Sequence, residues 1–205
     1  MLQDRQAGNA SLAHDPGALL EAELREHRVV FEAVTEMLKG PFLETLAILE
    51  TGLRRGGKVM LFGNGGSAAD AQHLAAELTI RYCSNRPSIS AMALTTDSSV
   101  LTACANDMGF DALFERQIAG LGRTHDVAVG LSTSGKSPNV LKGLHQARSM
   151  GLSTIGLSGA SGGEMPGLCD ACILVPSSVT ARIQEMHIMI GHMWCKSLEL
   201  RIGSV

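Results

Sequence analysis

Aromatic and charged side chains are both scarce in this sequence of 205 residues. Phe, Trp and Tyr together make up 3% of the chain, charged residues make up 18%, and the net charge is −3. Proteins that bind nucleic acids usually present a basic patch, and many stack bases on aromatic rings. The sequence has neither feature, so we expect no nucleic-acid partner.

Long apolar runs are also absent. No run approaches the roughly 20 residues that cross a bilayer, and residues 1–16 are polar, without the hydrophobic segment of a signal peptide. The five cysteines leave one unpaired in any disulfide scheme, which fits a reducing compartment. These observations predict a cytoplasmic protein with no membrane partner.

Two of the cysteines, Cys169 and Cys172, form a C-x-x-C pattern. The chain has no second pair to complete a four-cysteine zinc site. The pattern also precedes an apolar run rather than opening a helix. We therefore interpret both as small buried thiols.

Short apolar runs alternate with helical segments along most of the chain. The runs are apolar almost throughout, as expected for strands buried on both faces, and they cover 58–63, 89–94, 126–132, 153–158 and 171–176. Helices are predicted near 17–38, 42–55, 66–81, 98–119, 137–150 and 179–201. This order predicts an α/β fold with a doubly wound, mostly parallel five-stranded sheet and additional N-terminal helices. Residues 1–16 are interpreted as a flexible leader and residues 17–205 as a single domain.

Two of the predicted strands end in loops rich in glycine and hydroxyl groups. The first is Gly63-Asn64-Gly65-Gly66-Ser67, and the second is Ser132-Thr133-Ser134-Gly135-Lys136-Ser137-Pro138. Each directly precedes a predicted helix, whose N-terminal N–H groups attract anions, and Ser137 is the expected N-cap of its helix. Ligands of open parallel sheets bind at the carboxyl ends of the strands, so the two loops together predict a phosphate site.

The second loop also matches the nucleotide-binding pattern G-x-x-x-x-G-K-[ST] from Gly130 to Ser137. In that pattern the first glycine lies at the end of a strand, whereas Gly130 lies inside an apolar run. No apolar strand ends in the Asp that usually assists the metal ion. We therefore do not expect a nucleoside triphosphatase.

Two helices carry polar residues that could react with or coordinate a ligand. Asp70, His73 and Glu77 follow Ser67 at spacings of three and four residues and therefore share a helix face. A solvated helix face would produce the same pattern. On the last helix, Gln184 and His192 are about 12 Å apart along the axis. Both reach one metal ion only with extended side chains or if one comes from another subunit; the alternative is that they are core polar groups with partners.

Several motifs, in the same order, resemble the phosphoheptose (sedoheptulose 7-phosphate) isomerases of the SIS (sugar isomerase) domain superfamily. They are GNGGSAADAQHLAAEL (63–78), RPSISAMALTTDSSVLTACANDMGF (86–110), STSGKSPNV (132–140) and TARIQEMHIMIGH (180–192). The resemblance implies an aldose–ketose isomerase that serves nucleotide-activated heptose synthesis, for example for lipopolysaccharide core. It also implies a homotetramer with active sites at subunit interfaces.

The resemblance also implies roles for individual residues. Those matching substrate-binding positions are Asn64, Gly65, Gly66, Ser67, Glu77, Asn106, Asp107, Ser132, Thr133, Ser134, Ser137 and Gln184. Those matching zinc ligands, for one zinc ion per subunit, are His73, Glu77, Gln184 and His192. Glu77 and His192 match the pair that moves the proton between C1 and C2 of the sugar, a step that needs an acid and a base. We favour Glu77 as the base and His192 as the proton donor, and the reverse assignment stays open.

This sequence departs from the family pattern at three positions. Lys136 and Pro138 stand where the phosphate loop usually has Asn and Ala, and Ala181 stands where some members have Asp. Two alternative functions stay open: a non-catalytic SIS protein that binds the replication initiator DnaA, and another SIS activity on a sugar phosphate. The presence of Gly66, Glu77 and His192 favours the enzyme.

Overall fold

The computed structural model describes residues 15–202, so most of the predicted leader lies outside the described residues. Helix α2 (Pro16–Met37) begins at Asp15, whose carboxylate accepts hydrogen bonds from the N–H groups of Gly17 and Ala18. Helix α3 (Lys39–Arg54) follows after a single residue. It begins three residues earlier than predicted, because Pro41 lies in its first turn, where a missing N–H is tolerated.

The five strands form one parallel sheet in the order β2-β1-β3-β4-β5, which confirms the predicted fold class. Their bounds are β1 Val59–Gly63, β2 Ala91–Ala93, β3 Val127–Ser132, β4 Ser153–Gly159 and β5 Ala171–Val175. Strand β2 is shorter than predicted, because only Ala91, Met92 and Ala93 pair with β1. The winding direction changes between β1 and β3, and ligands of such sheets bind at this switch point.

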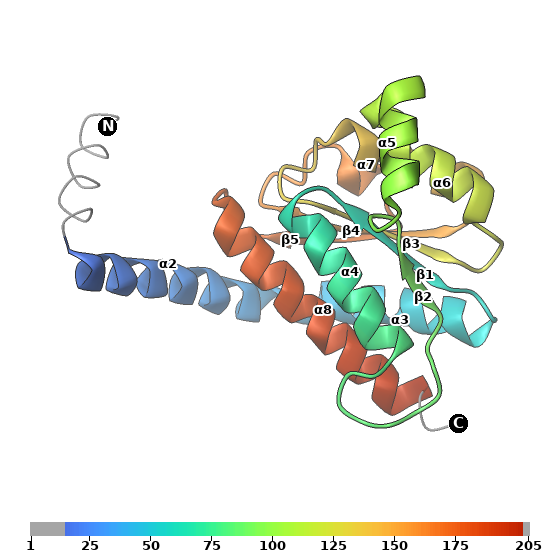
Figure 1. Ribbon diagram of the computed structural model, residues 1–205. Coiled ribbons are helices and arrows are strands. Elements are labelled where there is room, and N and C mark those ends of the chain that lie inside the picture. The colour runs from blue at the N-terminus through green and yellow to red at the C-terminus, as the bar shows by residue number, and fades with distance from the viewer. Residues whose placement is uncertain (1–14, 203–205) are drawn as a thin grey trace.

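Alternating side chains of each strand enter two separate cores. In β1, Val59 and Leu61 pack against α3, α4 (Gly66–Thr79) and α8 (Thr180–Ile202), whereas Met60 and Phe62 pack against α6 (Leu113–Leu121) and α7 (Pro138–Ser149). Figure 1 shows the two helical layers. Burial on both faces explains why the strands are almost continuously apolar.

The predicted helix over 98–119 is interrupted in the structure. Helix α5 (Ser98–Asp107) is followed by a 3₁₀ turn, η1 (Phe110–Ala112), and then by α6. The break lies at Gly109, whose φ of 86° is accessible to glycine and incompatible with a continuing α-helix. The prediction of one helix was therefore wrong.

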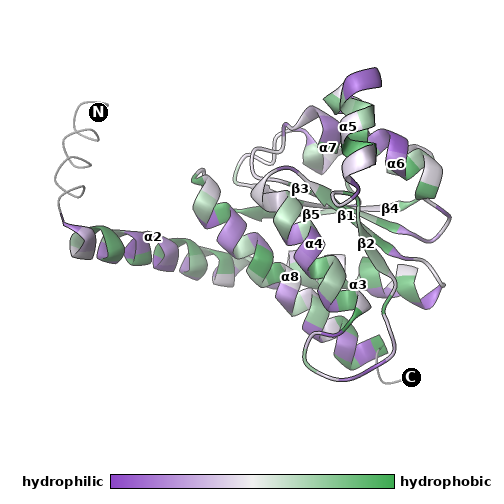
Figure 2. Cartoon of the chain, in the orientation of Figure 1, coloured by the Kyte–Doolittle hydropathy of each residue, from purple (hydrophilic) through white to green (hydrophobic). Residues whose placement is uncertain are grey.

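Helix α2 extends away from the rest of the molecule (Figure 1). Apolar residues recur along its length (Figure 2), and several of them are exposed: Leu19, Leu20, Leu24, Val29 and Phe31. The middle of α2 is held by α8, because Arg182 pairs with Glu23 and His27 with Glu185. Within residues 15–202, no helix has both the length and the apolar content of a membrane span.

Candidate active site

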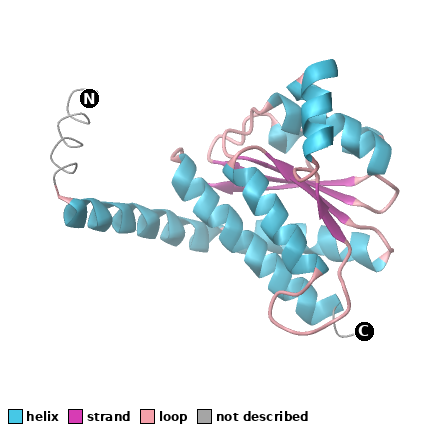
Figure 3. Ribbon diagram, viewed as in Figure 1, coloured by secondary structure: helices cyan, strands magenta, loops and turns pink. Residues whose placement is uncertain are grey.

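The two polar loops meet at the carboxyl ends of β1 and β3, adjacent strands at the centre of the sheet (Figure 3). A Cβ atom at Gly63 would lie 2.7 Å from the Leu131 carbonyl oxygen, so only glycine permits this approach. The amides of Asn64 and Asn139 exchange two hydrogen bonds, of 2.8 and 2.9 Å, and link the loops. The N-termini of α4 and α7 therefore converge beside one another, as a phosphate site requires.

The hydroxyl groups of the second loop lie close to one another. The Ser132 Oγ lies 2.9 Å from the Ser137 Oγ and 3.5 Å from the Ser134 Oγ. Ser137 occupies the N-cap position of α7, as predicted, but its side chain makes no capping hydrogen bond. Pro138 has no N–H, and the N–H groups of Val140 and Leu141 donate to the Ser137 carbonyl oxygen. The hydroxyl groups and the Asn139 N–H are therefore the groups available to an anion. The Lys136 residue is exposed.

The nucleotide-binding pattern in this loop does not correspond to a nucleotide-binding loop. Gly130 is paired with both Phe62 and Gly156 in the interior of the sheet. The sharp strand-to-helix turn begins only after Ser132. The prediction that Gly130 lies inside a strand is therefore confirmed.

A buried hydrogen-bonded chain connects this loop to helix α8. The Ser158 hydroxyl on β4 donates to the Ser132 carbonyl oxygen (2.8 Å), and the His187 Nε2 lies 3.3 Å from the Ser158 carbonyl oxygen. The His187 side chain is fully buried, and burial lowers its pKa to about 4. The buried, neutral imidazole of His187 therefore contacts the carboxyl end of β4, which in turn is hydrogen-bonded to the phosphate loop.

The second part of the site lies farther along α4, where α8 crosses it. The Nε2 atoms of His73 and His192 are 2.8 Å apart, and the Glu77 Oε1 is 3.5 Å from the His73 Nε2. Burial and the neighbouring His73 imidazole lower the pKa of His192. A neutral imidazole can accept a proton or bind a metal ion, so this cluster can do acid–base chemistry.

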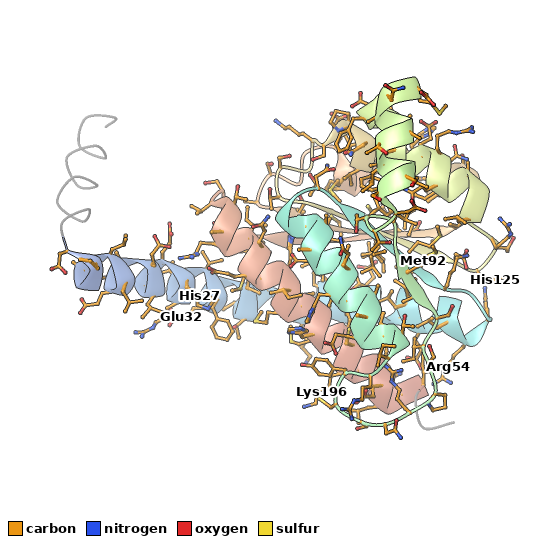
Figure 4. All side chains as sticks on the ribbon, viewed as in Figure 1. His27, Glu32, Arg54, Met92, His125 and Lys196 are labelled. Atoms are coloured by element: carbon orange, nitrogen blue, oxygen red, sulfur yellow. The ribbon has the colours of Figure 1, made fainter. Side chains whose placement is uncertain are left out.

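Tyr82 completes this cluster, and the sequence analysis did not identify it. Its ring centroid lies 5.5 Å from that of His192. The Glu199 carboxylate fixes the segment by accepting hydrogen bonds from the N–H groups of Tyr82, Cys83 and Ser84, and it also pairs with Arg86. Tyr82 and His192 line a groove of about 390 Å³, and its lining also includes Lys196 of α8, which is labelled in Figure 4. A second hollow, of about 550 Å³ near Arg116, contains none of the predicted site residues.

The structure does not bring Gln184 to the two histidines. A Cβ atom at Gly66 would collide with the Gln184 amide, so this side chain lies over the first loop, a full two turns of α8 from His192. Among the described residues, no three His, Cys, Asp or Glu side chains form an arrangement that could hold a metal ion. The four predicted zinc ligands are therefore divided between two places within one chain.

Other predicted residues lie outside these two clusters. Asn106 and Asp107 are exposed at the end of α5, where the Asn106 amide donates to the Asp107 carboxylate (2.7 Å). Asp70 is partly buried, one of its carboxylate oxygens has no hydrogen-bond partner, and burial raises its pKa to about 6. Asn139 was missed as a functional residue, although it follows Pro138 in the same motif as the serines.

Known protein families and sequences match most of this chain. The profile of the SIS domain family matches residues 24–159. Phosphoheptose isomerase from Paramagnetospirillum magneticum is 53% identical over 180 residues, which cover 88% of this chain and 94% of that protein. Phosphoheptose isomerase 1 from Campylobacter jejuni is 50% identical over 181 residues, with coverages of 88% and 97%.

Two solved structures show the same arrangement of elements. Phosphoheptose isomerase from Neisseria gonorrhoeae has a TM-score of 0.82 at 37% identity, and the match covers 98% of this chain and all of that one. The enzyme from Francisella tularensis has a TM-score of 0.86 at 31% identity, with coverages of 89% and 97%.

Proposed function

The chain belongs to the SIS domain family and, within it, to the phosphoheptose isomerases, and we propose that it converts sedoheptulose 7-phosphate to D-glycero-D-manno-heptose 7-phosphate. The observation that carries the proposal is the pairing of a serine-rich anion loop with a His–Glu–His cluster on the adjoining helices. One part suits a phosphate group, and the other suits proton transfer at a sugar carbon.

In this proposal the loops hold the phosphate end of the sugar. The hydroxyl groups of Ser132, Thr133, Ser134 and Ser137 donate to the phosphate oxygens. The N–H groups at the start of α4 and α7 contribute their positive ends. Holding the phosphate fixes the sugar chain, so that its C1 and C2 atoms are presented to the acid–base pair.

The reaction moves one proton between C1 and C2 through an enediol or enediolate. Glu77 removes the proton as the general base, and His192 provides a proton on the other side. The lowered pKa of His192 keeps its imidazole neutral near pH 7, and the same shift would also suit it to act as the base. Tyr82 packs on this imidazole and limits its orientations.

We further propose that His73, Glu77 and His192 bind one zinc ion. Two imidazole nitrogens and a carboxylate are favourable zinc ligands, and the contacts of His73 with His192 and with Glu77 support this. The three side chains of one chain do not form an arrangement that could hold a metal ion, so zinc binding would require them to move. Zinc bound there would polarise the sugar carbonyl or hold its hydroxyl groups. The predicted fourth ligand, Gln184, would have to come from another subunit.

We also propose a homotetramer whose active sites combine residues of different subunits. The exposed apolar side chains of α2 and the groove beside Tyr82 support assembly, because such surfaces are rare on monomers. All five cysteines are free thiols, in keeping with a cytoplasmic enzyme of heptose biosynthesis, for example for lipopolysaccharide.

The function is tested by following sedoheptulose 7-phosphate by NMR, with and without a metal chelator. We expect formation of the heptose, loss of activity with the chelator, and recovery when zinc is added. Absence of product with the zinc-loaded protein would refute the proposed isomerase activity. A DnaA pull-down would then test the non-catalytic alternative. Full activity at zero bound zinc would refute the metal proposal alone.

Mixing two inactive variants tests whether Gln184 and His192 of one active site come from different subunits. Gln184→Ala and His192→Ala proteins are each expected to be inactive. If Gln184 and His192 act in the same site from different subunits, mixing the two proteins during reassembly restores part of the activity. If they act within one chain, every mixed tetramer stays inactive, because no combination of subunits then contains an intact site.

A further inference from the structure

Cys169 and Cys172 place their sulfur atoms side by side. Cys169 follows the 3₁₀ turn η2 (Met165–Gly167), and Cys172 lies on β5. A Cβ atom at Gly156 on the neighbouring strand β4 would lie 2.8 Å from the Cys172 Sγ and 3.0 Å from the Cys169 Sγ. The missing side chain at Gly156 therefore leaves the space that both thiols fill.

The two thiols differ in their acidity. A hydrogen bond between them lowers the pKa of Cys172 and raises that of Cys169 well above its usual range, because Cys169 keeps its proton and donates it. Both residues are partly exposed, unlike Cys104 and Cys195, which are buried. The interpretation of the pair as simple buried thiols is thus incomplete. Cys172 is placed to ionise first, with a second thiol beside it.

The pair lies at one end of the β4–β5 connection, whose other end supports the phosphate loop. The Gly159 N–H donates to the Thr133 carbonyl oxygen (3.1 Å), and the Glu164 N–H donates to the Gly135 carbonyl oxygen (3.0 Å). A Cβ atom at Gly163 would collide with that same Gly135 carbonyl. A covalent link between Cys169 and Cys172 would therefore constrain the far end of the connection that supports the anion-binding serines.

We propose that Cys169 and Cys172 form a redox-active dithiol, which a peroxide converts to a disulfide. The Cys172 thiolate attacks one peroxide oxygen, the O–O bond breaks, hydroxide leaves, and Cys172 becomes a sulfenic acid. The Cys169 sulfur then attacks the Cys172 sulfur, the S–O bond breaks, and water leaves with the Cys169 proton. Two thiols lose two electrons and two protons, and hydrogen peroxide is reduced to two water molecules.

The test uses the full-length protein treated with hydrogen peroxide in a Cys83→Ser background, which removes the exposed cysteine. We expect the intact mass to fall by two hydrogen atoms and the peptide containing Cys169 and Cys172 to resist alkylation until a dithiol reductant is added. If both residues stay open to alkylation at a peroxide concentration that oxidises Cys83 in the wild-type chain, the proposal is wrong. Formation of sulfinic acid in place of the disulfide would also contradict it.

Two serine variants then separate the roles of the thiols. In Cys169→Ser, the sulfenic acid on Cys172 has no neighbour to condense with and is expected to be trapped by dimedone. In Cys172→Ser, no dimedone adduct is expected on Cys169, which has lost the thiol that reacts first. Equal labelling of both variants would overturn this order of reaction. The mass measurement on the parent protein decides the disulfide itself even if one variant fails to fold.

Discussion

The Nε2 atoms of His73 and His192 are 2.8 Å apart, although the two residues are separated by 119 positions in the sequence. This contact joins α4 to α8 and brings Glu77 into the same cluster. Neither helix carries the complete acid–base group alone. The chemistry of the site therefore depends on how closely these two helices pack.

That packing depends on Gly191, and we expect Gly191→Ala to destabilise the protein. A Cβ atom there would collide with the side chain of Leu74 on α4. Overpacking of this kind costs about 1–3 kcal/mol, measurable by urea unfolding, and activity should fall as the histidines separate. The matched control is Gly120→Ala on α6, where the new Cβ meets nothing and should stabilise the helix by about 0.5–1 kcal/mol. Equal stability of wild type and Gly191→Ala would contradict the role of close packing.

Replacing Glu77 by Gln keeps the shape of the side chain and removes its basicity. We expect the turnover number to fall at least about 100-fold, the lower range for a general acid–base residue. Release of the C1 or C2 proton to deuterated solvent, followed by NMR, should fall in parallel. Glu44→Gln, an exposed change on α3, is the control and should leave both rates unchanged. A variant that keeps a tenth of the activity would exclude Glu77 as the base.

Ser137→Ala should affect the binding of substrate more than its turnover. The hydroxyl group lies at the start of α7 beside Ser132, and a hydrogen bond to a charged group contributes about 1.5–3 kcal/mol. We therefore expect KM to rise about 10- to 100-fold, with a smaller change in kcat. Ser149→Ala, at the other end of the same helix, is the control. A change confined to kcat would contradict a role in holding phosphate.

His187 should make the folded protein sensitive to acid. Burial lowers its pKa to about 4 in the fold, whereas the unfolded chain binds a proton near pH 6.5. Stability contributed by the neutral form is therefore present above pH 6.5 and is lost as pH falls to about 4. The expected loss is about 3 kcal/mol relative to His187→Gln, which cannot be protonated.

The comparison with His187→Gln is needed because the ionisation of Asp70 changes the stability of the fold with pH in the opposite direction. Burial raises the pKa of this carboxyl to about 6, so its ionisation destabilises the fold as pH rises through this range. Asp70 is present in both proteins, and its contribution cancels in their difference. Urea unfolding from pH 4 to pH 7 measures that difference. A constant difference across this range would show that His187 does not titrate as described.

The sequence predicted the strands well because burial on both faces leaves a simple signal in β1, β3 and β4. The edge strand β2 was too long in the prediction, since only Ala91, Met92 and Ala93 pair with β1. The helix break at Gly109 depends on a backbone angle that the local pattern of apolar residues does not contain.

The loops of the site were identifiable for a different reason. Their glycines and serines are adjacent in sequence, so the short motifs around Ser67 and Ser137 are enough to predict anion binding. The meeting of His73 with His192, by contrast, follows from the absence of a side chain at Gly191. Tyr82 was missed because its place depends on the distant Glu199 carboxylate. No local pattern contains either relationship.

Helix α8 also sets the order in which the molecule can be completed during synthesis. The sheet and the phosphate loops are formed by residues that leave the ribosome before Thr180, whereas His192 follows them. Until α8 docks, the apolar faces of α3 and α4 that it covers are open to water and to other chains. A nascent chain that has formed its anion loops is therefore still without its proton-transfer pair, and its exposed core surface is what a chaperone would bind.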